Sequence, residues 1–98
     1  MQIIWTHEAL EQLTAIEDYI SKDSPERAAK FVDQLIEQAE SLPDGPRMGR
    51  VVPEIANPGI RELIFQKYRI VYRLNENYIE ILTVFEGHRL LRIGESNL

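Results

Sequence analysis

A run of arginines and apolar residues at 68–74 is the segment of the chain whose spacing most suggests recognition chemistry. On a strand, alternate residues share a face, so Arg69 and Arg73 point the same way. A guanidinium presents a planar fork of donors that suits carboxylates and phosphates. We expect this arginine face to be the outer face of a sheet and the tyrosine face to meet helices. Solvated cross-strand ion pairs, for example with Glu62 or Glu80, are the alternative interpretation.

The last part of the chain holds a histidine that could move protons. His88 lies beside Arg89 after the last expected strand, and histidine titrates near neutral pH. His7 stands at an expected helix start, where a purely local role is the simpler interpretation. The two histidines are far apart in sequence and there is no cysteine, so we expect no metal site, no disulfide and no cofactor.

Length and composition limit the classes of protein. The 98 residues are 44% hydrophobic and 28% charged, which is typical of one globular domain spanning 1–98. No apolar run approaches about 18 residues, so neither a membrane span nor a signal peptide is expected, and we expect a cytoplasmic protein. The formal net charge is −5, which argues against direct binding to nucleic acid. Residues 1–40 carry −6 and residues 41–98 carry +1, so recognition is expected in the second half.

Two amphipathic helices are expected near the N-terminus, over residues 6–22 and 24–42. Apolar residues recur at helical spacing in both segments and form one buried stripe in each. Thr6 and Ser24 are expected N-caps, and Pro25 suits the first position of the second helix. The short joint between the two segments predicts a helical hairpin.

Strand-like segments surround this hairpin. Residues 2–5 form a short apolar run, and residues 49–85 contain further β-type segments separated by turns, followed by a tail at 86–98 without clear periodicity. The predicted fold is therefore α+β: an N-terminal strand, a helical hairpin, and then a mostly antiparallel sheet of about four further strands.

Three stretches together resemble a known family: Ala9-x-x-x-Leu13-x-x-Ile16-x-x-Tyr19-Ile20, Ala28-x-x-Phe31-Val32, and the run from Pro46 through Ile60-Arg61-Glu62-Leu63 and Tyr68–Arg73 to Arg89. Over about residues 3–92 the chain resembles the RelE/ParE toxin superfamily, and within it the ParE branch. The resemblance implies the same α+β fold and a place in a bacterial type II toxin–antitoxin module. It also implies a cognate antitoxin that neutralises the toxin in a hetero-oligomer.

The superfamily divides by mechanism, and the resemblance implies different residues for each branch. RelE-like members cut mRNA on the ribosome with basic residues and often a C-terminal tyrosine, whereas ParE-like members poison DNA gyrase. Arg69 and Arg89 match arginines of a ribonuclease member, but a lysine of that member falls at Glu62 and its tyrosine falls near Glu95. A carboxylate at position 62 would repel a phosphate and could not stabilise its transition state.

We therefore expect a gyrase poison with no catalysis of its own. The alternative is a ribosome-dependent mRNA endonuclease that uses Arg69, His88 and Arg89, and a third possibility is a member that only binds its antitoxin. Arg61 is expected to join the arginine face through hairpin pairing, and the expected target-binding residues are Arg61, Arg69, Arg73, Arg89 and Arg92. Apolar residues left over on the hairpin are expected to bind the antitoxin, namely Leu10, Tyr19 and Phe31.

Overall fold

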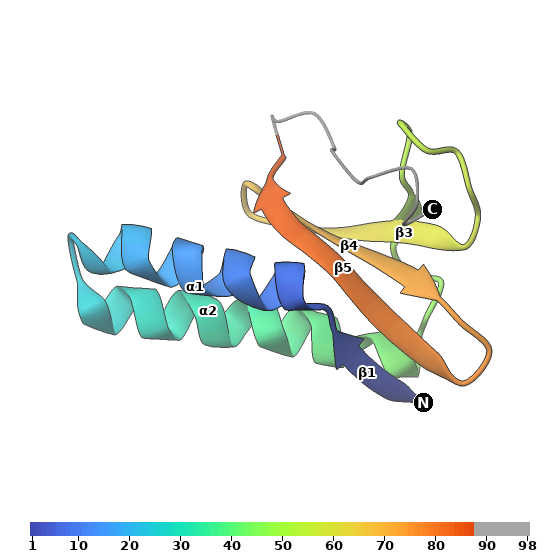
Figure 1. Ribbon diagram of the computed structural model, residues 1–98, viewed down its shortest axis with the longest axis horizontal. Helices are drawn as coiled ribbons and strands as arrows, with labels where there is room; N and C mark the ends of the chain where they lie inside the picture. Colours follow the sequence, from blue (N-terminus) through green and yellow to red (C-terminus); the bar gives the residue numbers. More distant parts are fainter. Residues whose placement is uncertain (88–98) are drawn as a thin grey trace.

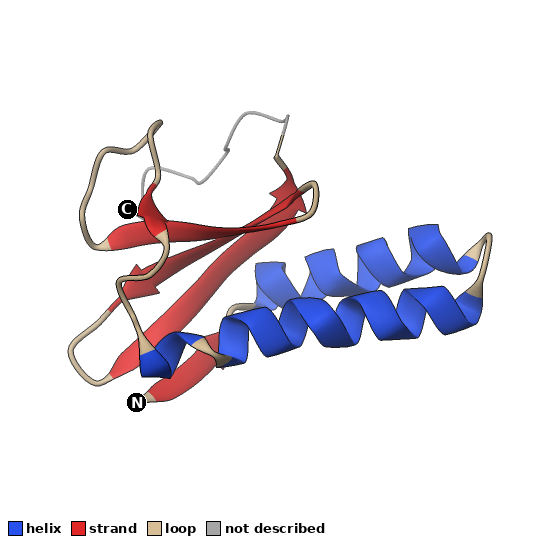
Figure 2. Cartoon of the chain, turned by 180° about the vertical axis from the view of Figure 1, so that it is seen from behind, coloured by secondary structure: helices blue, strands red, loops and turns tan. Residues whose placement is uncertain are grey.

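Two helices in a hairpin cover one face of a five-stranded sheet in the computed structural model, which describes residues 1–87 (Figure 1). Helix α1 spans His7–Ser21 and helix α2 spans Pro25–Glu40. The hairpin extends past the sheet at the end where the helices are joined (Figure 2). Neither helix in residues 1–87 is long and apolar enough to cross a membrane.

The helix ends confirm the expected caps. The Thr6 hydroxyl oxygen accepts a hydrogen bond from the Ala9 backbone N–H, and the hydroxyl itself donates to the carbonyl of Leu82. Ser24 caps α2 in the same way, by accepting from the Arg27 N–H. Both helices are slightly shorter than the expected ranges, because the capping residues lie outside them and Leu42 belongs to the turn that follows α2. A 3₁₀ turn, η1, follows α2 at Leu42–Asp44.

The sheet confirms the mostly antiparallel prediction. Its spatial order is β1-β5-β4-β3-β2, where only β1 and β5 run parallel. The strands are β1 (Gln2–Trp5), β2 (Arg50–Val51), β3 (Ile60–Phe65), β4 (Tyr68–Leu74) and β5 (Tyr78–Glu86). Strand β5 therefore includes Glu86, the first residue of the expected tail, and Gly87 follows in a turn. Residues 88–98 of that tail lie outside the described residues.

Both faces of the sheet carry apolar clusters. On the helix side, Tyr68, Ile70 and Tyr72 of β4 pack into the main core, as predicted. On the other face, Val71 belongs to a second buried cluster. This cluster includes Val52, from the loop between β2 and β3, together with Ile60, Leu82 and the partly buried Ile55 and Phe85. The expectation that this second face is the outer, solvated face is therefore wrong around Val71. The physical reason is that the segment 52–59 folds back over it.

A buried tyrosine fixes the segment that leads into β2. Tyr72 is fully buried, its hydroxyl donates to the Pro46 carbonyl at 2.8 Å, and it accepts from the Gly49 N–H at 3.1 Å. A Cβ at position 49 would lie only 2.5 Å from that hydroxyl oxygen, so the close approach requires glycine. Burial raises the pKa of Tyr72 above its ordinary value, which keeps the hydroxyl protonated as a donor.

Candidate functional site

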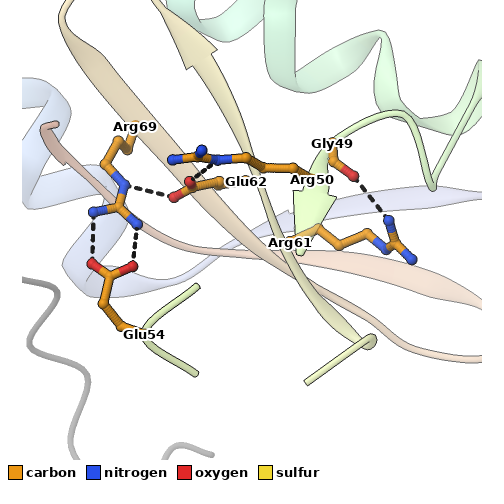
Figure 3. A network of polar contacts seen from close by, with 6 residues as sticks. All are labelled: Gly49, Arg50, Glu54, Arg61, Glu62 and Arg69. Carbon is orange, nitrogen blue, oxygen red and sulfur yellow. Dashed lines mark hydrogen bonds and ion pairs between the residues drawn. The ribbon is translucent and has the colours of Figure 1, made fainter. Parts of the chain in front are cut away.

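Arg69, the central arginine of the expected target face, is buried in a network of ion pairs (Figure 3). Its Nε donates to Glu62 at 2.6 Å, and its two terminal nitrogens donate to the two carboxylate oxygens of Glu54, each at 2.8 Å. The guanidinium carbon also lies 5.1 Å from the centre of the Phe85 ring. Arg69 lies on the sheet face away from the helices, as expected, but only 5% of it is exposed, so the expectation that it is solvated there is wrong.

Glu62 joins this arginine to a second one. Its other carboxylate oxygen accepts from Arg50 Nε at 2.6 Å, and only 1% of Glu62 is exposed. Burying carboxylates and guanidiniums is costly unless they are paired and hydrogen-bonded. The four side chains of this network, Arg50, Glu54, Glu62 and Arg69, carry two charges of each sign and satisfy that condition. The hydrogen bonds to Glu54, and then those to Glu62, raise the pKa of Arg69, while burial acts in the opposite direction.

Strand register explains how these residues meet. Arg50 is directly opposite Glu62 across β2 and β3, so the two side chains lie on one face. Arg69 is opposite Ile64, two residues beyond Glu62 on the same face of β3, which is the diagonal position that a long side chain can reach. Glu54 reaches the network from the segment that covers the second cluster. The sequence interpretation that an Arg–Glu62 pair forms across the strands is thus correct, but the pair is buried.

The other two described arginines of the expected target face do not share one surface. Arg73 is opposite Glu80, as the alternative interpretation predicted, with 3.4 Å between its terminal nitrogen and the carboxylate. Arg61 is opposite Tyr72 and therefore lies on the helix-side face, where it donates to the backbone carbonyls of Pro58 and Gly49. The expectation that Arg61 joins the arginine face is wrong. The hairpin register pairs odd-numbered residues of β3 with even-numbered residues of β4.

The two histidines and the last two arginines complete the set of expected site residues. His88, Arg89 and Arg92 lie outside the described residues. His7 is exposed in the first turn of α1, where its imidazole lies 2.7 Å from Glu11 one turn later. Within residues 1–87, no group of three or more histidine or acidic side chains is arranged to hold a metal ion.

The expected antitoxin-binding residues divide between two places on the hairpin. Tyr19 is 63% exposed and Leu10 is 50% exposed, but nine residues along a helix turn the chain by about 180° beyond whole turns. The two therefore flank the buried stripe of α1 on opposite sides. Phe31 of α2 is half-buried and lines a groove of about 550 Å³ together with Tyr19 and Tyr68.

The same groove contains residues that sequence reasoning missed. Arg27, Lys30 and Lys67 line it, from the start of α2 and from the turn between β3 and β4. The one signal in the sequence is the choice of cation: the chain has only three lysines, and arginine dominates the second half. Their distance along the chain hid the fact that the hairpin and the β3–β4 turn bring them together.

Comparisons with known proteins agree on one family. Residues 3–91 match the model described as ParE toxin of type II toxin-antitoxin system, parDE. Toxin RelE2 of Caulobacter vibrioides is 36% identical over 90 residues, which cover 91% of this chain and 98% of that protein. A putative toxin of Sinorhizobium fredii, Y4kP, is 36% identical over 94 residues and 90% of each chain.

Solved structures show the same architecture. The chain superimposes on a chain of the chromosomal ParDE toxin–antitoxin system of Pseudomonas aeruginosa with a TM-score of 0.74 and 30% identity, over 88% of this chain and 95% of that one. A chain of the RelBE2 toxin–antitoxin complex of Mycobacterium tuberculosis gives a TM-score of 0.61 at 23% identity, over 87% of this chain and 88% of that one. The second likeness shows the fold alone.

Replacing Glu62 by glutamine tests the structural role of the buried network. Glu62→Gln keeps the side-chain shape but leaves Arg69 with one carboxylate partner, so we expect the free energy of unfolding to fall by about 3 kcal/mol. Urea denaturation followed by circular dichroism measures it. Glu80→Gln is the matched control, because its pair with Arg73 is longer and about a quarter exposed, and we expect a loss below about 1 kcal/mol. Equal losses in both variants would contradict the assignment.

Proposed function

Since this chain belongs to the ParE toxin family and is a toxin of a type II toxin–antitoxin system, we propose that it arrests growth by binding and poisoning DNA gyrase. In this proposal the toxin acts by protein–protein contact and performs no catalysis. The likeness to a chain of a ParDE system at 30% identity supports the ParE-like mechanism.

The observation that carries the proposal is the saturation of Arg69. A nuclease that cleaves without a metal needs cationic donors free to contact the phosphate in the transition state. Here the three donating nitrogens of Arg69 are directed at Glu54 and Glu62, and 5% of the residue is exposed. Arg69 is therefore unsuited to phosphate binding.

Glu62 helps to make Arg69 unsuited to phosphate binding, but by a different route from the one expected from the sequence. Direct repulsion of a phosphate was expected, but the carboxylate is buried between Arg50 and Arg69. Its charge is matched there, so its effect is to hold Arg69 inside the fold and away from any substrate.

A ribosome-dependent mRNA endonuclease is the second candidate function. It is favoured by the 36% identity to a relative named Toxin RelE2. Such an enzyme would use Arg69, His88 and Arg89, of which Arg69 alone lies within residues 1–87, and its donors are engaged.

For gyrase recognition we retain four of the expected arginines as candidates: Arg61, Arg73, Arg89 and Arg92. Arg61 and Arg73 lie on opposite faces of the sheet, so they do not form one continuous patch. Arg69 affects activity through the fold in this proposal. Charges at the rim of an interface act mainly on the rate and salt dependence of encounter.

Two assays run side by side distinguish the candidate functions. Purified toxin is added to gyrase with plasmid, and separately to translating ribosomes. We expect trapped gyrase cleavage complexes and intact mRNA, with weaker trapping for Arg89→Ala or Arg92→Ala at unchanged melting temperature. His88→Gln is expected to trap gyrase as well as the parent protein does. Cut mRNA with gyrase unaffected would overturn the proposal in favour of the endonuclease.

We further propose that a cognate antitoxin neutralises the toxin by covering the exposed apolar residues of the hairpin. The match to the ParE toxin family model and the likeness to a chain of a ParDE system at 30% identity support an antitoxin partner. Tyr19 and Phe31 line one groove and offer adjacent aromatic surface, whereas Leu10 lies across α1 from them. Antitoxin segments that fold on binding can use such a groove as a helix or an extended chain.

Truncating Tyr19 tests this surface. Because Tyr19 is 63% exposed, Tyr19→Ala should leave the melting temperature nearly unchanged. Loss of an aromatic anchor costs about 2 kcal/mol of binding, which corresponds to roughly a 30-fold weaker affinity for the antitoxin. Calorimetry measures the affinity, and Leu10→Ala is the companion variant on the other side of α1. A lower melting temperature with unchanged affinity would show that Tyr19 serves the fold.

A further inference from the structure

All three lysines of the chain surround one groove. Lys30 and Lys67 line it, and the ammonium of Lys22 stands 5.9 Å from the centre of the Tyr19 ring, which forms part of its wall. All three are exposed. They come from the loop after α1, from α2, and from the β3–β4 turn, so only the folded chain brings them together.

This clustering contrasts with the charge of the surrounding hairpin. Residues 1–40 contain nine acidic residues and only three basic ones, Lys22, Arg27 and Lys30. Every basic residue of that region therefore lies within residues 22–30, which span the joint between the helices and the first part of α2. Among the residues that line the groove, Asp23 is the one acid.

The floor of the groove is aromatic and packs against the sheet. The ring of Phe31 lies 5.4 Å from that of Tyr68 and 5.7 Å from that of Phe65, measured between ring centres. Tyr68 is buried and belongs to the main core, so the floor is fixed by the sheet. A volume of about 550 Å³ has room for a large side chain.

We propose that this groove binds an acidic segment of the antitoxin, with one aliphatic or aromatic side chain of that segment seated on the aromatic floor. The inference rests on the proposed neutralisation by an antitoxin and adds the chemistry that the partner must carry. The apolar anchor supplies affinity, and the lysines attract and orient the acidic flanks.

Charge complementarity favours a protein over a nucleic acid at this place. The chain carries −5 overall and residues 1–40 carry −6, which opposes a long polyanion. A short acidic segment can place its charges next to the lysines. Charges farther from the lysines than about 8–10 Å, the Debye length, would be largely screened.

Charge reversal gives the first test. In Lys30→Glu combined with Lys67→Glu, we expect the association rate with the antitoxin to fall at least tenfold at low salt, and the salt dependence of that rate to flatten. Arg47→Glu is the matched control, because it makes the same change at an exposed arginine that lines a different pocket. It should leave the rate nearly unchanged. Equal effects of the control and the lysine variants would overturn the inference.

Amine footprinting of the unmodified chain gives the second test. Acetylation with an N-hydroxysuccinimide ester, read by mass spectrometry, reports on Lys22, Lys30, Lys67 and the amino group of Met1, which lies at the opposite end of the molecule from the hairpin tip (Figure 1). We expect at least fivefold slower labelling of Lys30 and Lys67 in the antitoxin complex. Unchanged labelling in a complex that does form would overturn this inference and leave the proposed neutralisation standing. Failure of the antitoxin to bind would overturn both, and protection by a single-stranded 20-nucleotide DNA instead would identify a nucleic-acid site.

Discussion

The pairing of Arg69 with Glu62 and Glu54 is the interaction on which the far side of the sheet depends. It joins β4 to β3 and to the segment 52–59, and Arg50 extends it to β2. That segment places Val52 and Ile55 over the second apolar cluster, which would otherwise face water. Because a buried charge without its partner is strongly destabilising, each member of the network constrains the position of the others.

Much of the fold could be predicted from the sequence because its signals are local. Helical spacing, the caps at Thr6 and Ser24, and the alternation in 68–74 depend on neighbours along the chain. The register of β3 on β4 does not depend on neighbours along the chain, and this register places Arg61 on the helix side. The covering segment 52–59 also has no periodic signal, so an Arg69–glutamate pair could be predicted but its near-complete burial could not. The lysines meet only through tertiary packing, which composition cannot show.

The fold divides the basic residues of the described chain into those that are paired inside the protein and those that are exposed to a partner. Arg69 is engaged inside the protein, and Arg73 is paired with Glu80 and partly buried. The lysines instead remain exposed around an apolar groove, where their charges are available to a partner. Cations that can contact a partner are therefore not confined to the arginine-rich half, because burial and pairing determine which of them are accessible.

The claim that Arg69 acts through the fold is tested most directly by removing its charge together with that of Glu62. In Arg69→Met combined with Glu62→Leu, an apolar pair replaces the buried ion pair, a change that is often neutral or stabilising. The outer partners Arg50 and Glu54 can then be solvated, since their side chains are 59% and 33% exposed. Growth arrest in cells that lack the antitoxin is measured beside the melting temperature. The account predicts a folded protein that remains toxic, and a folded protein that has lost its toxicity would contradict it.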